Sequence, residues 1–116
     1  MAGTMRAARF TAATRTLEVV DVPIPAPGPT EVLVRVEACG ICLSDVHLLE
    51  GTLPGPLPVV TPCHESAGTV QRVGELVPGW TPGDRVLLAG GRNCGTCPWC
   101  VRGRCRTPPS PACRAS

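Results

Sequence analysis

Two groups of potential metal ligands occur in the sequence, and they differ in how their members are spaced. One group is contiguous, because Cys94, Cys97 and Cys100 follow one another at every third position. Thiolates at this spacing, held by tight turns, are typical of a structural zinc loop. The other group comes from two separated segments and consists of Cys42, Ser44, Asp45, His47, His64 and Glu65. Its thiol, imidazoles, hydroxyl and carboxylates are what a metal site that performs chemistry requires.

Cys42 and His64 are the candidate ligands of the second group. We expect Cys42 at the start of a short helix, where the helix dipole and a bound cation both favour the thiolate. His64 offers a nitrogen ligand suited to Zn²⁺, and Asp45 or Glu65 could accept the proton of its other ring nitrogen. These side chains together predict a zinc site.

Ser44 and His47 could add a proton route to this site. They are three residues apart on the expected helix, so their side chains are neighbours. The pair could then pass a proton from the site to solvent. Taken singly, a histidine on a short helix is more often a surface residue, and Cys39 is expected to be a small buried hydrophobe. The functional interpretation depends on the combination.

The elements that position these residues are expected to be mostly β, because Pro and Gly interrupt nearly every stretch long enough for a helix. Residues 43–50 are the exception, with Gly51 placed to cap the end of a short helix. Strands are predicted over residues 5–10, 16–22, 31–37, 68–73 and 84–89. In the third of these, Val32, Val34 and Val36 alternate with other residues, which predicts one buried face. Short strands with frequent turns favour a small barrel.

Composition restricts the possible partners. The 116 residues suffice for one domain, and only 3% are aromatic, which argues against stacking platforms for bases. Residues 92–116 hold five Arg and no acid, whereas the first 91 carry a net charge of −3. A zinc ion bound by four thiolates is a net anion that nearby Arg would offset, so we expect no nucleic-acid partner.

The cysteines and the N-terminal segment suggest a compartment. Eight cysteines in a short chain could form a disulfide framework, but that interpretation expects a secretory signal. Residues 1–17 contain no apolar run of the needed length, so we expect a cytoplasmic protein. No segment approaches ~20 apolar residues, and we therefore expect no membrane span.

Several ordered motifs carry a family resemblance. The segment Cys-Gly-Ile-Cys-Leu-Ser-Asp-Val-His over residues 39–47, followed by His-Glu-Ser-Ala-Gly over 64–68, resembles the N-terminal catalytic domain of zinc-dependent medium-chain alcohol dehydrogenases. Gly-Asp-Arg-Val over 83–86 and the contiguous cysteine group also fit, so the resemblance covers about residues 5–101. It implies a mainly β, GroES-like, partly open barrel over residues 1–91 with one short helix. A zinc lobe of the same domain would follow over 92–105, and residues 106–116 would form an irregular tail.

The resemblance implies a metal centre. Cys42 and His64 would ligate the catalytic zinc, Glu65 would lie beside it, and Asp45 would support His64. Zinc would act as a Lewis acid on a small alcohol or aldehyde substrate. In this family the hydride passes to NAD or NADP on a Rossmann domain.

Other roles are implied for residues around the metal. Ser44 would take the alcohol proton, His47 would release it, and Leu53 would line the substrate channel. The structural zinc would be held by Cys94, Cys97, Cys100 and a fourth cysteine.

Three features depart from the family pattern. Cys63 stands where the family has Gly before His-Glu, so it could strain a backbone position that needs positive φ, or offer an extra thiol to the metal. Pro108 occupies the place of the fourth structural cysteine, for which Cys105 and Cys113 are substitutes. Cys105 is favoured because it closes the shorter loop. Finally, the sequence contains no Gly-x-Gly-x-x-Gly segment and no Rossmann domain.

These departures favour a catalytic-domain fragment that binds zinc but is inactive as an isolated chain. The Arg-, Pro- and Ala-rich residues after Arg104 suggest a truncated or frame-shifted relative of a longer enzyme. The alternative is a zinc-stabilised structural or interaction module without catalysis. A redox protein using Cys94 and Cys97 is a further reading, but the third close cysteine argues for metal.

Overall fold

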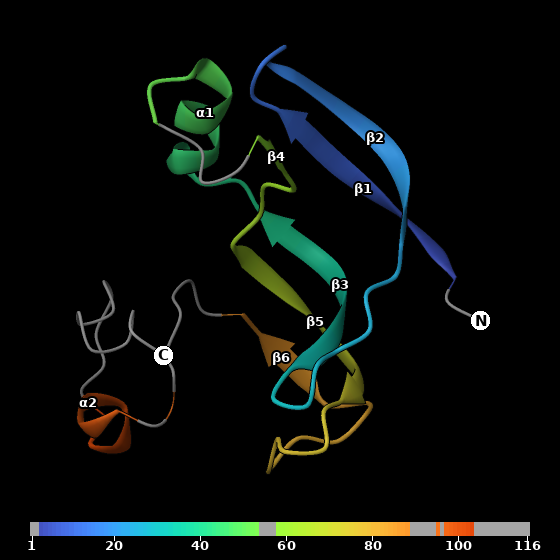
Figure 1. The fold of residues 1–116 in the computed structure, drawn as a ribbon, viewed down its shortest axis with the longest axis vertical. Coiled ribbons are helices and arrows are strands. Elements are labelled where there is room, and N and C mark those ends of the chain that lie inside the picture. Colours follow the sequence, from blue (N-terminus) through green and yellow to red (C-terminus); the bar gives the residue numbers. More distant parts are fainter. Residues whose placement is uncertain (1–2, 54–57, 89–94, 96, 104–116) are drawn as a thin grey trace.

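The structure is a computed structural model that describes residues 3–53, 58–88, 95 and 97–103. Two three-stranded antiparallel sheets make up its described part, with strand orders β2-β1-β4 and β3-β5-β6 (Figure 1). The elements, in chain order, are β1 (Thr4–Thr11), β2 (Thr16–Pro23), β3 (Val32–Gly40), α1 (Leu43–Glu50), β4 (Val59–Val60), β5 (Glu65–Val73), β6 (Arg85–Leu87) and α2 (Pro98–Val101). The predicted mostly β architecture is confirmed.

The first sheet is built on the hairpin of β1 and β2. Its ladder runs without interruption from the pair Thr4↔Pro23 to the pair Thr11↔Thr16. Arg15 in the connecting turn has φ 53°, a left-handed conformation that lets the two strands reverse direction closely. Phe10 on β1 is only 2% exposed and pairs with Val60 of β4, so this aromatic ring anchors the sheet.

The second sheet depends on a close approach between β3 and β5. A Cβ atom at Gly68 of β5 would collide with the backbone carbonyl oxygen of Arg35 on β3. Two register shifts interrupt the pairing, between Leu33 and Val34 and between Val36 and Ala38. The prediction that Val36 lies on a buried face is wrong, because the side chain is 52% exposed. Val32 and Val34 of the same face are half-buried, so burial of this face ends before Val36.

The short helix α1, which follows β3, matches its prediction. Helix α1 spans residues 43–50, and Gly51 closes it with φ 77°. Strands β3 and β5 extend further than predicted, to Gly40 and from Glu65, because each supplies the ladder partner of the other. β4 and α2 were not predicted, as they contain only two and four residues. In the portion of the chain that the structure describes, no helix has the length and apolarity to cross a bilayer.

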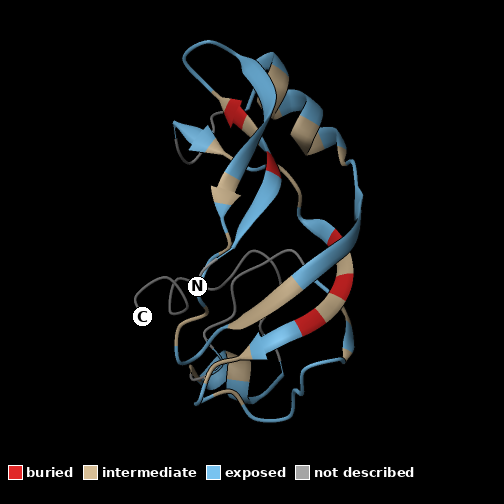
Figure 2. Cartoon of the chain, turned by 90° about the vertical axis from the view of Figure 1, so that its right-hand side faces the viewer, coloured by how far each residue is buried: buried red, intermediate tan, exposed pale blue. Residues whose placement is uncertain are grey.

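Few of the described residues are buried. The buried apolar residues are Ala7, Phe10 and Val70, while many strand residues such as Val19 and Leu87 are exposed (Figure 2). Several large apolar side chains on the two sheets therefore remain in contact with solvent. Ser66 is the one buried polar residue of the described segments, and it lies on β5 next to the candidate site.

Candidate metal centre

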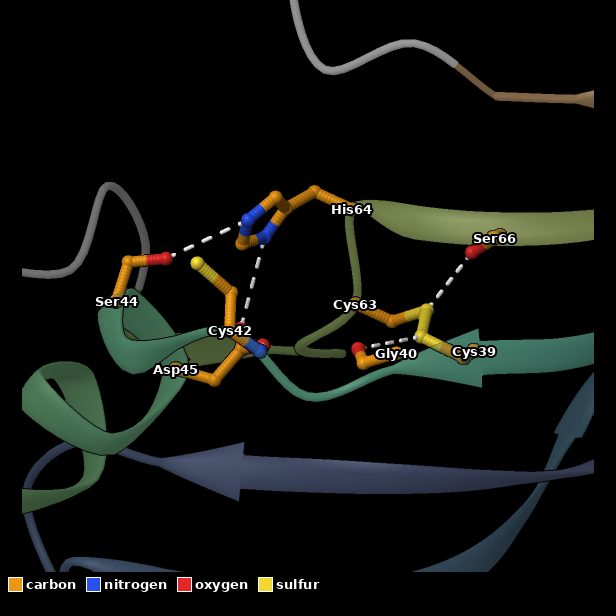
Figure 3. The surroundings of a disulfide bond; sticks show 8 residues. All are labelled: Cys39, Gly40, Cys42, Ser44, Asp45, Cys63, His64 and Ser66. Atoms are coloured by element: carbon orange, nitrogen blue, oxygen red, sulfur yellow. Dashed lines mark hydrogen bonds and ion pairs between the residues drawn. A yellow bond between two sulfur atoms is a disulfide. The ribbon is translucent and has the colours of Figure 1, made fainter.

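The end of the β3–β5 ladder brings the two predicted ligand segments together. The last rung of the ladder is Gly40↔Glu65. Cys42 follows this rung on one strand by two residues, and His64 precedes it on the other by one. Both side chains therefore emerge at the same end of the sheet, where Cys42 also forms the N-cap of α1 (Figure 3).

Three donor atoms converge at this end. Sγ of Cys42, a ring nitrogen of His64 and a carboxylate oxygen of Glu65 all lie within 4.8 Å of one another. Cys42 is half-buried, whereas His64 and Glu65 are exposed. Thiolate, imidazole and carboxylate are the three ligand types that bind Zn²⁺ in proteins, and three protein ligands leave a position open for substrate. The donor set therefore fits zinc.

Asp45 contacts both ligand segments. Its Oδ2 accepts a hydrogen bond from the backbone N–H of Cys42 at 3.1 Å, and its Oδ1 lies 3.6 Å from Nδ1 of His64. The carboxylate side chain is only 14% exposed. If the ring proton sits on Nδ1, facing this carboxylate, then Nε2 is unprotonated. Nε2 is then the nitrogen that can bind a metal, on the side of Cys42 and Ser44. Oγ of Ser44 lies 3.4 Å from that Nε2.

The two ligand side chains shift each other's protonation. The hydroxyl of Ser44 lowers the pKa of the Cys42 thiol most, followed by the backbone N–H of Ser44 and by His64. The hydrogen bond with Cys42 raises the pKa of His64, against a smaller opposing effect of desolvation. Both shifts favour a thiolate beside an imidazolium when no metal is bound. A metal ion would replace the imidazole proton as the partner of the thiolate.

An open cleft of about 450 Å³ lies against the centre. Its lining joins the polar His64, Glu65 and Ser66 to the apolar Ala38, Ala67, Leu87 and Leu88, with Gly40 between them. A Cβ atom at Gly40 would stand 2.8 Å from Oε2 of Glu65, so the missing side chain makes room for the carboxylate. The cleft can thus accept a small molecule with a polar end at the metal and an apolar remainder.

A disulfide joins Cys39 to Cys63 beside the centre. The expectation that Cys39 is a buried hydrophobe is wrong, because it is exposed and bonded. The idea that Cys63 offers an extra thiol to the metal is wrong for the same reason. Cross-linking residues 24 apart stabilises a fold by roughly 3 kcal/mol in the chain-entropy picture. Sequence reasoning missed the bond because a cytoplasmic chain is expected to hold its cysteines reduced.

The backbone at Cys63 has the conformation that its family position suggested. Its φ is 140°, in the region that favours glycine, so the possibility of strain there is confirmed. A residue with a side chain in such a region costs roughly 1–3 kcal/mol and persists only where its surroundings hold it. The hydroxyl of the buried Ser66 contacts the sulfur of Cys63 at 2.8 Å, and the disulfide ties the same sulfur to β3.

Two predicted site residues lie apart from the donors. Nδ1 of His47 is 3.7 Å from Oε2 of Glu50, one turn along α1. Among the described residues it makes no hydrogen bond to Ser44, its expected neighbour. Leu53 is 47% exposed and does not line the cleft. The roles of His47 and Leu53 therefore stay predictions.

The contiguous cysteine group is described in part. Cys97 forms the N-cap of α2, and its Sγ accepts a hydrogen bond from the backbone N–H of Cys100 at 3.4 Å. Cys94, Cys105 and Cys113 lie outside the described residues, so the predicted fourth ligand stays a prediction.

Comparison with known proteins places this fold and site in one family. Residues 28–110 match the alcohol dehydrogenase GroES-like domain. A sorbitol dehydrogenase of Pongo abelii is 43% identical over 97 residues, which cover 81% of this chain and 27% of that protein. The chain therefore belongs to the alcohol dehydrogenase GroES-like domain family. It spans about a quarter of the length of the curated relatives it matches.

Solved structures show the same likeness. A thermostable alcohol dehydrogenase from Pyrobaculum aerophilum with bound cobalt and zinc is 36% identical, with a TM-score of 0.75 over 88% of this chain and 31% of that one. An acetophenone reductase from Geotrichum candidum in complex with NAD is 35% identical, with a TM-score of 0.72 over 85% of this chain and 29% of that one. The expected GroES-like fold is confirmed.

Proposed function

We propose that this chain is the zinc- and substrate-binding part of an NAD(P)-linked alcohol dehydrogenase, with zinc held by Cys42, His64 and Glu65. The observation that carries the proposal is the convergence of these three donors within 4.8 Å at one end of the β3–β5 ladder. The zinc of the Pyrobaculum enzyme and the NAD of the Geotrichum reductase support the choice of cofactors. Zinc at this centre would act as a Lewis acid toward the oxygen of an alcohol or aldehyde.

The chain's own residues would bind and orient the substrate. Asp45 holds the backbone of Cys42 and faces Nδ1 of His64, so it keeps both ligands directed at one point. The hydroxyl of Ser44 is near enough to the donors to accept the alcohol proton, which His47 would pass to solvent. Leu87 and Leu88 of the cleft would contact the carbon portion of the substrate, with Leu53 further along its channel.

The remaining expectations complete this proposal. A small alcohol or aldehyde is the substrate class, the location is cytoplasmic, and neither nucleic acid nor membrane is a partner. Because the chain covers only 27% of the sorbitol dehydrogenase, we expect these 116 residues alone to bind zinc without oxidising alcohol. A second, structural zinc would be held by the contiguous cysteine group, with Cys105 as the fourth ligand.

The contiguous group also favours a second candidate function, a zinc-stabilised module without catalysis. The N–H to sulfur hydrogen bond from Cys100 to Cys97 is what a structural metal loop needs, and it does not depend on the β3–β5 centre. In that case the chain would bind one zinc at the contiguous group and none at Cys42.

Cobalt substitution separates the two candidates. Co²⁺ bound to thiolates absorbs strongly, and each site contributes its own share of the absorption. We expect Cys42→Ser to remove the share of the β3–β5 centre and Cys97→Ser to remove that of the contiguous group. Leu43→Ala, which changes an exposed side chain beside Cys42, is the matched control. If Cys42→Ser leaves the absorption unchanged and Cys97→Ser abolishes it, the zinc-stabilised module without catalysis is favoured.

A further inference from the structure

The disulfide links the two segments that carry the proposed ligands. Cys63 immediately precedes His64, and Cys39 lies three residues before Cys42. The bond joins β3 to the segment just before β5 where their ladder ends, since Cys39 pairs with Ser66 and the last rung is one residue beyond (Figure 3). A change in this bond therefore acts directly on the backbone that leads into the metal centre.

The backbone of Cys63 needs an external constraint to keep its shape. Its φ of 140° favours glycine, and a side chain at that position disfavours the conformation. Two contacts hold the side chain: the bond to Cys39, and the hydroxyl of Ser66 at 2.8 Å from its sulfur. Only the first is covalent. Without it, Cys63 can rotate toward an ordinary φ, and His64 moves with the peptide that joins them.

We propose that the Cys39–Cys63 disulfide is a redox-sensitive control on divalent metal binding at the Cys42, His64 and Glu65 centre. The oxidised chain holds His64 in place and binds the metal, whereas the reduced chain binds it more weakly. This inference rests on the proposed function of that centre. Cys39 is exposed, so a reductant can reach the bond from solvent. Cytosolic disulfides, where they occur, are usually transient and redox-sensing.

The chemical step is thiol–disulfide exchange with a dithiol. One reductant thiolate attacks a sulfur of the pair, the sulfur–sulfur bond breaks, and the released cysteine takes up a proton. The second reductant thiol then attacks the mixed disulfide and frees the other cysteine. Two electrons and two protons pass to Cys39 and Cys63, and the reductant leaves as its own disulfide.

Glycine at position 63 distinguishes conformational control from simple cross-linking. Cys63→Gly removes the disulfide but adopts a φ of 140° without cost. Cys39→Ser also removes the disulfide and leaves a side chain at the strained position. Both variants lack the disulfide, but control through the backbone predicts that only Cys39→Ser weakens metal binding, whereas Cys63→Gly keeps it.

The test measures Co²⁺ affinity at the centre by competition with a chelator, using the part of the absorption that Cys42→Ser abolishes. Wild-type chain is prepared oxidised, or reduced with a water-soluble phosphine that takes up oxygen from water and is then removed under nitrogen. Peptide mapping of the Cys39–Cys63 cross-link verifies each state. We expect reduction to weaken binding roughly tenfold, or about 1.4 kcal/mol. Re-oxidation should restore the affinity.

The variants decide the mechanism. We expect Cys39→Ser to bind like reduced wild type, and Cys63→Gly to bind like oxidised wild type whether or not phosphine was used. Equal affinity of oxidised and reduced wild type would overturn the inference while leaving the proposed centre in place. So would a Cys63→Gly affinity as weak as that of Cys39→Ser. A Co²⁺ signal that is indifferent to Cys42→Ser would instead overturn the proposed function, and the inference with it.

Discussion

Asp45 faces His64 at the candidate metal centre, with Oδ1 3.6 Å from Nδ1, while its second oxygen accepts the backbone N–H of Cys42. One carboxylate thus fixes the orientation of an imidazole and the path of the chain at a thiol. Its own side chain is largely shielded from solvent, which strengthens the contact with the ring.

Replacing the Asp45 carboxylate by an amide should weaken metal binding. Asp45→Asn keeps an oxygen for the N–H of Cys42 but removes the charge that faces Nδ1 of His64. Partners of metal-bound histidines are worth about 10- to 100-fold in affinity, and we expect a loss in that range by chelator competition. Asp21→Asn, which removes the same charge from β2, is the control. An unchanged affinity in Asp45→Asn would show that the carboxylate does not orient the ring.

The titration of His64 should report its contact with Cys42. In the metal-free chain we expect the pKa of His64 above its ordinary value of 6.5, and Cys42→Ser should bring it down, since the hydrogen bond with Cys42 is the largest cause of the shift. The stability from this contact is fully present below the pKa of the unfolded chain and is lost as pH rises through the raised folded pKa. NMR titration of the ring resonances measures the pKa of His64 in the wild type and in Cys42→Ser. A His64 pKa that does not change in Cys42→Ser would contradict this prediction.

Metal binding at the centre should weaken as the pH falls. A metal ion needs the thiolate of Cys42 and the neutral ring of His64, so protons compete with it. The raised pKa of His64 places the onset of this competition above the range of an ordinary histidine. The lowered pKa of Cys42 means that the thiol limits binding less than an ordinary cysteine would. Zinc affinity measured across pH should follow the His64 titration of the preceding experiment; an affinity independent of pH would exclude these two ligands.

Gly40→Ala should affect the metal centre more than the fold. The added Cβ would lie 2.8 Å from Oε2 of Glu65, a flexible carboxylate that can swing away and leave the donor group. We expect severalfold weaker Co²⁺ binding with little change in the unfolding midpoint. Gly3→Ala, whose Cβ would make ordinary contact with Ile24 at 3.5 Å, is the matched control. If Gly40→Ala binds Co²⁺ like wild type, Glu65 is not a ligand.

Gly68→Ala, in contrast to Gly40→Ala, should lower the stability of the fold. Its Cβ would meet the backbone carbonyl of Arg35, which cannot move without opening the β3–β5 ladder. Overpacking of this kind costs about 1–3 kcal/mol or more, and denaturant titration should show the loss directly. A variant as stable as wild type would mean that the two strands can separate locally without cost.

The sequence was most informative where short-range patterns decide the structure. Helix α1 and its Gly51 cap depend on neighbouring residues, and both were predicted correctly. The motif residues Cys42, His64 and Glu65 were also expected together, although only the register of β3 and β5 brings them within reach.

Long-range register explains what the sequence did not predict. The exposure of Val36 depends on what packs against its face of the sheet, which the alternation of residues along one strand does not reveal. The bond between Cys39 and Cys63 requires knowing which residues face each other at the end of a ladder. His47 was expected beside Ser44 from helical spacing, yet its ring turned to Glu50, because rotamer choice decides between two neighbours that are equally near.

The position of the donors beyond the last rung of the β3–β5 ladder has a consequence for the stability of this sheet. Strands β3 and β5 are joined through α1 and a long connection, so their pairing must close a large loop before any rung forms. Cys42 and His64 lie inside that loop, next to the two residues of the last rung. A zinc ion held by both residues would keep that loop closed and so stabilise the paired strands.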